Sequence, residues 1–256
     1  MVGRQVVREK LRGYGMSDVG ALYRFRVAPE DDKQIAGIMH EIFDAMAIEE
    51  FPTGEVITYT VYRDPAVPGQ WYMFEHFTAK GAAAHADPAT SPRILIPGRK
   101  QLELMIDTYD RSELEPVIVH GCGELIPGAP PPPASRDRSA DVGAVYKFKV
   151  APENDKRTEQ IFRDLFAAMG DEEYPTGDVI TYTIYRDPAE LGRWVMFEHF
   201  TAKGAANHAT ETSPRIQKLG QEHLTLLLEP YERVVLEPFI VYGCGEPIPG
   251  SPAAAH

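Results

Sequence analysis

The spacing of hydrophobic and polar positions changes along the first half of the chain and predicts a strand followed by a helix. Residues 20–28 alternate with a period of two, which is typical of a strand. After Pro29 the hydrophobic residues lie at helical spacing and form one stripe: Ile35, Ile38, Met39, Ile42, Phe43 and Met46. This stripe predicts an amphipathic helix that packs on one face of a sheet.

The next segments predict two strands, two helices and a final strand. Residues 56–63 and 70–77 are rich in β-branched and aromatic residues, and the Asp-Pro and Pro-Gly pairs between them predict a hairpin. Thr78 can cap a short Ala-rich helix. A second amphipathic helix is expected at about 98–107, and a last strand at 116–121. The order β-α-β-β-α-β is that of a ferredoxin-like unit.

The same pattern occurs twice in the chain. Residues 74–83 recur unchanged at 197–206, and residues 18–30 recur in closely similar form at 141–153. This internal duplication predicts an α+β protein with two ferredoxin-like repeats. We expect an N-terminal arm at 1–17, a first domain at 18–124, a Pro-rich linker at 125–140 and a second domain at 141–248.

A ferredoxin-like sheet has helices on one face only, so its other face needs a partner. The second repeat, tethered by a short linker, can supply that partner within the same chain. We therefore predict that the two repeats form a pseudo-dimeric α+β barrel.

Composition limits the classes of partner. The chain has 38 acidic and 26 basic residues and a net charge of -12, which argues against nucleic acid and anionic membranes as partners. No segment has the apolar length of a membrane span, and the first residues have no apolar core of a secretory signal. Only Cys122 and Cys244 are present, too few for a disulfide framework. These features predict a cytoplasmic protein.

The two cysteines lie in matching Gly-Cys-Gly turns. His120 precedes Cys122 by two residues, but Tyr242 takes its place before Cys244, so we do not expect a catalytic thiol.

Three segments together resemble the antibiotic-biosynthesis monooxygenase family of dimeric α+β barrels. They are a Tyr-Arg-Asp-Pro turn at 62–65, an aromatic strand at 71–77, and an Ala-rich helix that places His85 eight residues after Phe77. The second copy repeats the motif with Glu198, Phe200 and His208. The resemblance implies an oxygenase that needs no metal, flavin or haem. The same fold also includes haem-degrading enzymes, isomerases and proteins without assigned activity.

His85 and His208 are the candidate catalytic histidines, each as a general base or a hydrogen-bond donor. Alternatively each histidine fixes its helix to the sheet, and haem ligation is a further alternative. Glu75 and Glu198 lie within apolar strands, so each carboxylate must be paired or have a raised pKa. Glu75 and Glu198 are thus expected to tune the histidines, or to form ordinary salt bridges.

Four basic residues in the two first strands are candidate ligands of an anionic substrate: Arg24, Arg26, Lys147 and Lys149. If Tyr23 and Phe25 face the helices, period-two geometry turns these side chains toward the barrel. We expect Glu75 and Glu198 on that same face, within reach of the basic residues. The alternative is that the basic residues are solvated at the barrel rim.

Several aromatic residues could bind a phenolic ligand or line a pocket, although packing is the ordinary role of such residues: Tyr59, Tyr182, Trp71 and Trp194. His76 and His199 alternate with the glutamates, so they are expected on the opposite face in a structural role. No third ligand lies at a zinc-like interval, so no metal site is expected.

The leading hypothesis is a cofactor-independent monooxygenase that acts on an aromatic or polyketide-like small molecule with dioxygen. A ligand-binding barrel without turnover is one alternative, and an isomerase or lyase with the same base is another. Self-association beyond the fused pair stays open.

Overall fold

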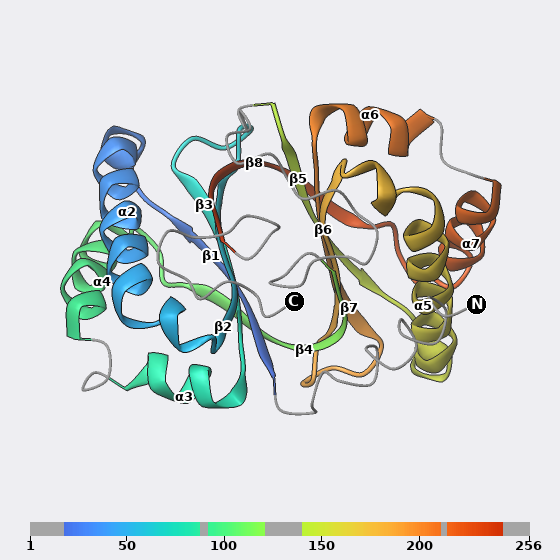
Figure 1. The fold of residues 1–256 in the computed structure, drawn as a ribbon, viewed down its shortest axis with the longest axis horizontal. Helices are drawn as coiled ribbons and strands as arrows, with labels where there is room; N and C mark the ends of the chain where they lie inside the picture. The colour runs from blue at the N-terminus through green and yellow to red at the C-terminus, as the bar shows by residue number, and fades with distance from the viewer. Residues whose placement is uncertain (1–17, 88–91, 121–139, 211–213, 243–256) are drawn as a thin grey trace.

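The computed structural model describes residues 18–87, 92–120, 140–210 and 214–242 (Figure 1). The first repeat contains β1 (Val19–Arg26), α2 (Asp32–Glu49), β2 (Val56–Arg63), β3 (Gln70–Phe77), α3 (Ala79–Ala86), α4 (Pro92–Leu104) and β4 (Asp110–His120). The second contains β5 (Val142–Lys149), α5 (Asp155–Glu172), β6 (Val179–Arg186), β7 (Arg193–Phe200), α6 (Ala202–Thr210), α7 (Pro214–Leu224) and β8 (Glu232–Tyr242). The predicted order of elements is therefore confirmed in both repeats.

The strands of both repeats close into a single barrel, in the order β1-β3-β2-β8-β5-β7-β6-β4. Each repeat forms its own antiparallel sheet, and its last strand then pairs with the other repeat: β4 with β6, and β8 with β2. No sheet edge is left open between the repeats, because each last strand completes the sibling sheet. The predicted pseudo-dimeric α+β barrel is confirmed.

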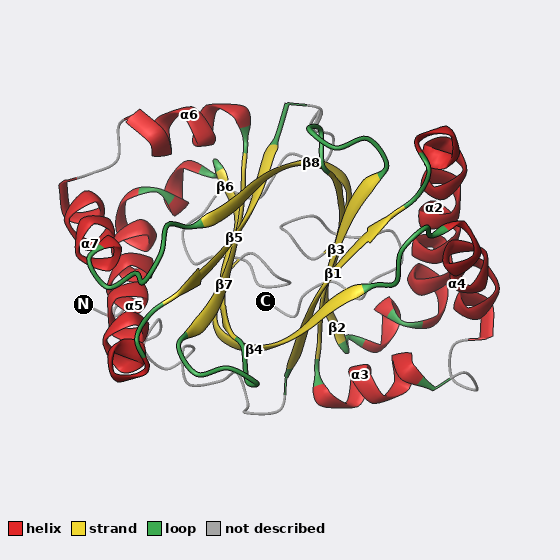
Figure 2. Cartoon of the chain, turned by 180° about the vertical axis from the view of Figure 1, so that it is seen from behind, coloured by secondary structure: helices red, strands yellow, loops and turns green. Residues whose placement is uncertain are grey.

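The helices lie outside the barrel in two groups, one for each repeat (Figure 1, Figure 2). α2 begins with a charged first turn and then buries Ile35, Ile38, Met39, Ile42 and Met46 against its sheet, so the predicted stripe is correct apart from the half-buried Phe43. Thr78 caps α3 as predicted, because its hydroxyl accepts a hydrogen bond from the Gly81 amide at 3.1 Å.

Two kinds of core result from this arrangement. Between each sheet and its helices lies a core built from that repeat and the last strand of its sibling. Inside the barrel lies a third core, shared by the two repeats: Leu22, Tyr62, Tyr72, Phe74, Leu114, Val145, Tyr185, Val195, Phe197 and Leu236. Both faces of every sheet are thus buried, unlike a free ferredoxin-like sheet.

Two boundaries differ from the sequence prediction. α4 begins at Pro92 rather than near residue 98 and contains Pro97 in its interior. Pro92 fits a first helical turn, and the amide that Pro97 lacks costs one hydrogen bond, which packing of this helix against α2 offsets. β4 begins at Asp110, before the predicted start, and its register shifts beside Pro116, where a proline is tolerated. The predicted arm (1–17), nearly all of the linker and both cysteines lie outside the described residues.

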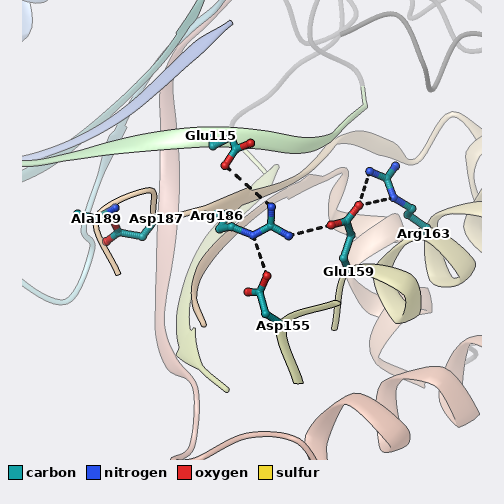
Figure 3. Close-up of polar contacts among 7 residues, drawn as sticks. All are labelled: Glu115, Asp155, Glu159, Arg163, Arg186, Asp187 and Ala189. Atoms are coloured by element: carbon teal, nitrogen blue, oxygen red, sulfur yellow. Dashed lines mark hydrogen bonds and ion pairs between the residues drawn. The ribbon is translucent and has the colours of Figure 1, made fainter. Parts of the chain in front are cut away.

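An arginine network links the two repeats where β4 pairs with β6. The Arg186 guanidinium of β6 contacts Asp155 at 3.2 Å and Glu159 at 2.8 Å, both on α5, and Glu115 of β4 at 3.9 Å (Figure 3). The same guanidinium lies over the Trp194 ring at 4.7 Å. This cluster therefore connects the last strand of the first repeat to a helix of the second.

No helix among the described residues is both long and apolar enough to cross a membrane.

Candidate functional site

Glu75 lies on the helix side of its sheet and not inside the barrel. It follows Trp71 and Met73 at period two on β3, and both of those residues pack in the core beneath α2. One Glu75 carboxylate oxygen lies 3.9 Å from Nε2 of His85 on α3. The expectation that Glu75 shares a face with Arg24 is therefore wrong, because the register places Arg24 opposite Tyr72, a barrel residue.

The basic residues of the first strands lie at the rim of the barrel. Arg24 pairs with Asp110 at 3.0 Å and Arg26 with Asp107 at 3.7 Å, and both arginine side chains are about half exposed, at 46% and 48%. Lys149 pairs with Glu190. Lys147 lies opposite Glu232 in the β5–β8 register. The register places Arg24 on the barrel side, but the carboxylate partners of Arg24, Arg26 and Lys149 are Asp110, Asp107 and Glu190 rather than Glu75 and Glu198.

His76 and His199 are completely buried and point into the barrel, so the prediction that they lie opposite the glutamates is confirmed. They lie on the other side of the sheet from the helix histidines. The candidate catalytic residues therefore gather beneath the helices, once in each repeat.

In the first repeat, His85 bridges two carboxylates. Its Nδ1 lies 2.9 Å from a carboxylate oxygen of Glu50, which caps the carboxyl end of α2, and its Nε2 faces Glu75. The Phe77 ring packs against the imidazole at a centroid distance of 4.9 Å. His85 thus joins helix to sheet, and it also forms part of a buried acid–base cluster.

The second repeat contains the same cluster with small changes. Nδ1 of His208 lies 3.1 Å from Glu173 at the end of α5, and Phe200 packs on the imidazole at 4.9 Å. The His208 charge acts on Glu198, the equivalent of Glu75. The duplication has therefore preserved the whole cluster and not only its sequence motif.

Burial and charge raise the pKa values of the glutamates and histidines in both clusters. Burial raises the pKa of the Glu75 and Glu198 carboxyls above the usual value, although the neighbouring histidine partly opposes that rise. Burial lowers the pKa of His85 and His208, but hydrogen bonding to Glu50 or Glu173 and the nearby carboxylate charges outweigh it, so the net pKa is raised. A glutamate with a raised pKa beside a cationic histidine is a suitable general base.

Tyrosines surround each glutamate. Tyr23 in the first repeat and Tyr146 in the second interact with the carboxylate, and burial with that charge raises the pKa of each to about 12. An arginine of the last strand donates to each hydroxyl: Arg111 to Tyr23 at 3.1 Å, and Arg233 to Tyr146 at 2.9 Å. Both tyrosines therefore stay protonated near neutral pH and can donate hydrogen bonds.

A pocket of about 350 Å³ opens beside Glu198 in the second repeat. Its polar lining consists of Tyr182, Glu198, His208, Gln217, Gln221, His223 and Tyr231, and its apolar lining consists of Phe162, Leu165, Met196, Ile216 and Leu224, with Gly220 between them. A cavity of this size, in which polar groups converge beside an apolar wall, is within the range of small-molecule sites.

The four aromatic candidates lie on the helix side and are almost fully buried. Tyr182 lines the pocket. Its counterpart Tyr59 lies opposite Glu75 in the β2–β3 register, and its hydroxyl has no hydrogen-bond partner within the described ranges. Trp71 and Trp194 pack in the two helix-side cores, beneath Arg63 and Arg186 respectively.

Among the described residues, no group of three potential ligands is placed to hold a metal ion.

Sequence reasoning missed several residues of the cluster. Glu50 and Glu173 are separated from their histidines by 35 residues. Of the pocket residues, His223 lies on the second helix after Glu198, and Tyr231 follows that helix. For two of these positions, repetition in the duplication was the available signal, because Glu50 matches Glu173 and Tyr109 matches Tyr231.

No protein-family model matches the chain, and no curated protein matches it in sequence. Solved structures share its fold. A provisionally named monooxygenase from Lactobacillus acidophilus aligns with a TM-score of 0.70 at 10% identity, over 90% of this chain and 97% of its own. One from Fusobacterium nucleatum aligns with a TM-score of 0.71 at 12% identity, over 91% of this chain and 97% of its own.

An anthrone oxidase-like protein also aligns, with a TM-score of 0.50 at 11% identity, over 93% of this chain and 97% of its own. These alignments span both repeats, so the solved structures contain the same two-repeat barrel. The predicted resemblance to barrel monooxygenases is confirmed at the level of the fold.

Proposed function

We propose that this protein is a cofactor-independent monooxygenase that oxidises an anthrone-like aromatic ketone or phenol in the pocket of its second repeat. The observation that carries this proposal is the pocket of about 350 Å³ in which Glu198, His208 and Tyr231 face an apolar wall. A fold shared with proteins named as monooxygenases and as an anthrone oxidase-like protein supports the choice of chemistry.

Glu198 is the proposed base. Its raised pKa lies closer to the working pH than the pKa of an ordinary carboxyl group. The positive charge of His208 opposes the rise and so favours the ionised carboxylate. The carboxylate accepts a C–H proton activated by the carbonyl of the substrate. The C–H bond breaks, its electron pair moves toward the carbonyl oxygen, and an enolate results.

Dioxygen then reacts with this electron-rich enolate. A C–O bond forms, and the peroxide takes a proton back from Glu198 to give a hydroperoxide. Loss of the second C–H proton breaks the O–O bond, so that one oxygen atom remains as the new carbonyl and the other leaves as water. The substrate supplies all four electrons that dioxygen accepts. The apolar wall at Phe162, Leu165 and Met196 excludes water from the reactive anion.

His85 and Glu75 form the equivalent acid–base cluster in the first repeat, and we propose that they retain the same roles. We assign the reaction to the cytoplasm, because two cysteines in 256 residues suit a reducing compartment.

Dioxygen consumption with anthrone, in metal-free buffer with chelator, tests the function. We expect consumption above the buffer rate, with one quinone formed for each dioxygen consumed. Glu198→Gln should lower kcat by about 100-fold or more, because it removes a general base. Lys203→Ala is the matched control, since Lys203 lies on α6 with His208 but is 73% exposed.

Glu75→Gln measures the share of turnover that belongs to the first repeat. Tight binding of anthrone without dioxygen consumption would instead establish a ligand-binding barrel and overturn the proposed oxygenase.

A further inference from the structure

His223 contains a buried nitrogen without a hydrogen-bond partner among the described residues. This residue of α7 is 1% exposed and lines the pocket, and its Nε2 makes no hydrogen bond to the part of the chain that the structure describes. Buried polar atoms in folded proteins are nearly always hydrogen-bonded. An unpartnered nitrogen on a pocket wall is therefore a position at which a ligand can supply the missing hydrogen bond.

The other imidazole nitrogen is already engaged. The Tyr231 hydroxyl lies 2.5 Å from Nδ1 of His223. Phe148 and Phe162 pack on the imidazole with ring centroids 4.9 and 4.6 Å away. The imidazole is thus fixed in orientation by one hydrogen bond and two aromatic rings.

The charge state of the pair is determined by this apolar setting. Burial lowers the pKa of His223 to about 4, and burial with the charge of Glu198 raises the pKa of Tyr231 above its usual value. At neutral pH the imidazole is therefore uncharged and the tyrosine is protonated. A neutral imidazole has a single N–H, on either Nδ1 or Nε2.

The hydrogen bond with Tyr231 selects the tautomer. Among the described residues, Nδ1 of His223 is the acceptor available to the Tyr231 hydroxyl. If the hydroxyl donates to Nδ1, that nitrogen cannot also bear a proton. The proton of the imidazole then resides on Nε2, and the Nε2–H group points at the ligand space as a donor.

The first repeat contains an independent parallel. Gln101 occupies the position of His223, because the offset in this segment is 122 residues. Gln101 is 3% exposed, and its side chain interacts with Tyr109, the counterpart of Tyr231. An amide nitrogen can only donate. Both repeats therefore place a buried residue with an N–H donor beside the matching tyrosine.

We infer that the Nε2–H group of His223 donates a hydrogen bond to the oxyanion that forms on the substrate in the second-repeat pocket. This inference rests on the proposed function and adds a catalytic residue to it. A fixed donor stabilises charge that develops on the substrate oxygen. Because the imidazole is neutral, it polarises the oxygen without protonating it, so the enolate keeps the electron density that dioxygen needs.

The tautomer can be measured without any ligand. Nitrogen NMR of the folded full-length protein at neutral pH should show a neutral His223 with its proton on Nε2, assigned by comparison with His223→Gln. A spectrum with the proton on Nδ1, or with both nitrogens protonated, would overturn the inference.

The donor role is tested with anthrone bound under anaerobic conditions, where the absorbance reports the fraction present as enolate. His223→Leu should lower the ionisation constant of the bound anthrone by about 10-fold, the effect of a hydrogen bond to a charged group. His223→Gln restores an amide donor and should keep the constant within about 3-fold of the wild type.

The outcomes of these measurements distinguish the donor role of His223 from the proposed oxygenase activity. If His223→Leu binds anthrone and ionises it like the wild type, the donor role is wrong even if turnover is confirmed. If the wild type ionises anthrone through His223 but consumes no dioxygen, the donor role stands and the oxygenase proposal fails. A wild-type protein that does not bind anthrone overturns both.

Discussion

The Tyr62 hydroxyl lies 3.3 Å from Nδ1 of His199 inside the barrel, although 137 residues separate the two in the chain. Nε2 of the same histidine lies 3.1 Å from Asp141. The duplication reproduces the contact with the repeats exchanged, because Tyr185 of the second repeat lies 3.4 Å from Nδ1 of His76 in the first. Each repeat thus inserts a tyrosine beside a buried histidine of its sibling.

Removing one of these hydroxyls should weaken the joint between the repeats. We expect Tyr62→Phe to lower the free energy of unfolding by about 1 kcal/mol, because a buried hydrogen bond is lost while the ring packing is kept. Urea denaturation measures the change. Tyr185→Phe, the symmetry-related variant, should behave alike, and unchanged stability in both would show that these contacts do not hold the barrel together.

The inserted tyrosine also requires a glycine opposite it. A Cβ at Gly143 would lie 3.0 Å from Cε1 of Tyr62, whose ring is fixed in the barrel core. Gly143→Ala should therefore cost about 1–3 kcal/mol of stability through overpacking. Gly98→Ala in α4 is the control: a Cβ there meets no atom within 4 Å, so a small gain from helix propensity is expected. Equal effects of the two substitutions would contradict the packing argument.

The barrel closes through strands exchanged between repeats, so the two halves should depend on each other. We expect residues 1–130 and 136–256, expressed together as separate chains, to purify as a one-to-one complex through the β2–β8 and β4–β6 pairs. Each half alone should aggregate or self-associate, because its barrel face and last strand lack partners. Size-exclusion chromatography that finds two folded monomers would refute this dependence.

The pH dependence of turnover should reflect the ionisation of Glu198. The base works only when ionised, and burial raises its pKa above the usual 4.5, so kcat/KM should rise with pH through a midpoint above that value. The His208 cation lowers the pKa of this carboxyl. Replacing His208 with Gln should consequently move the rising limb to higher pH, whereas Lys203→Ala should leave it in place. If the rising limb of the profile moved to lower pH when His208 was replaced, Glu198 would be excluded as the base.

His223 should make the stability of the protein sensitive to acid. Its pKa is about 4 in the folded state and 6.5 in the reference state, so the unfolded chain binds more protons between these values. This contribution is fully present above pH 6.5 and declines as the pH falls toward 4, by about 3 kcal/mol in total. Urea denaturation of the wild type and of His223→Gln at a series of pH values isolates the contribution of His223 to the free energy of unfolding. Parallel curves for the two proteins would show that His223 is not buried uncharged.

The sequence by itself determined the duplication, the order of elements and the barrel. The repeated segments at 74–83 and 197–206 establish two copies of one unit. Period-two and helical spacing then locate the strands and helices, since each element has a distinctive hydrophobic period. The one-sided sheet requires a partner, and the tethered second copy supplies it. The motif around Phe77 and His85 also marked the helix histidines that the structure places in the acid–base clusters.

Only the tertiary structure decided which face of β3 meets the helices. Both faces of this strand are buried, with Trp71 and Met73 on one side and Tyr72 and Phe74 on the other, so hydrophobicity does not distinguish them. The pairing register of β3 with β1 and β2 decides which face meets the helices, and it places Glu75 beneath them.

The partners of the candidate site were likewise decided by the tertiary structure. Glu173 lies at the end of one helix, His208 on another, and His223 on a third, and no local periodicity relates them. They meet because all three helices pack on the same face of one sheet. The charge state of His223 has the same origin, since the apolar surroundings that keep the imidazole neutral are assembled from α5 and β5 only when the chain folds.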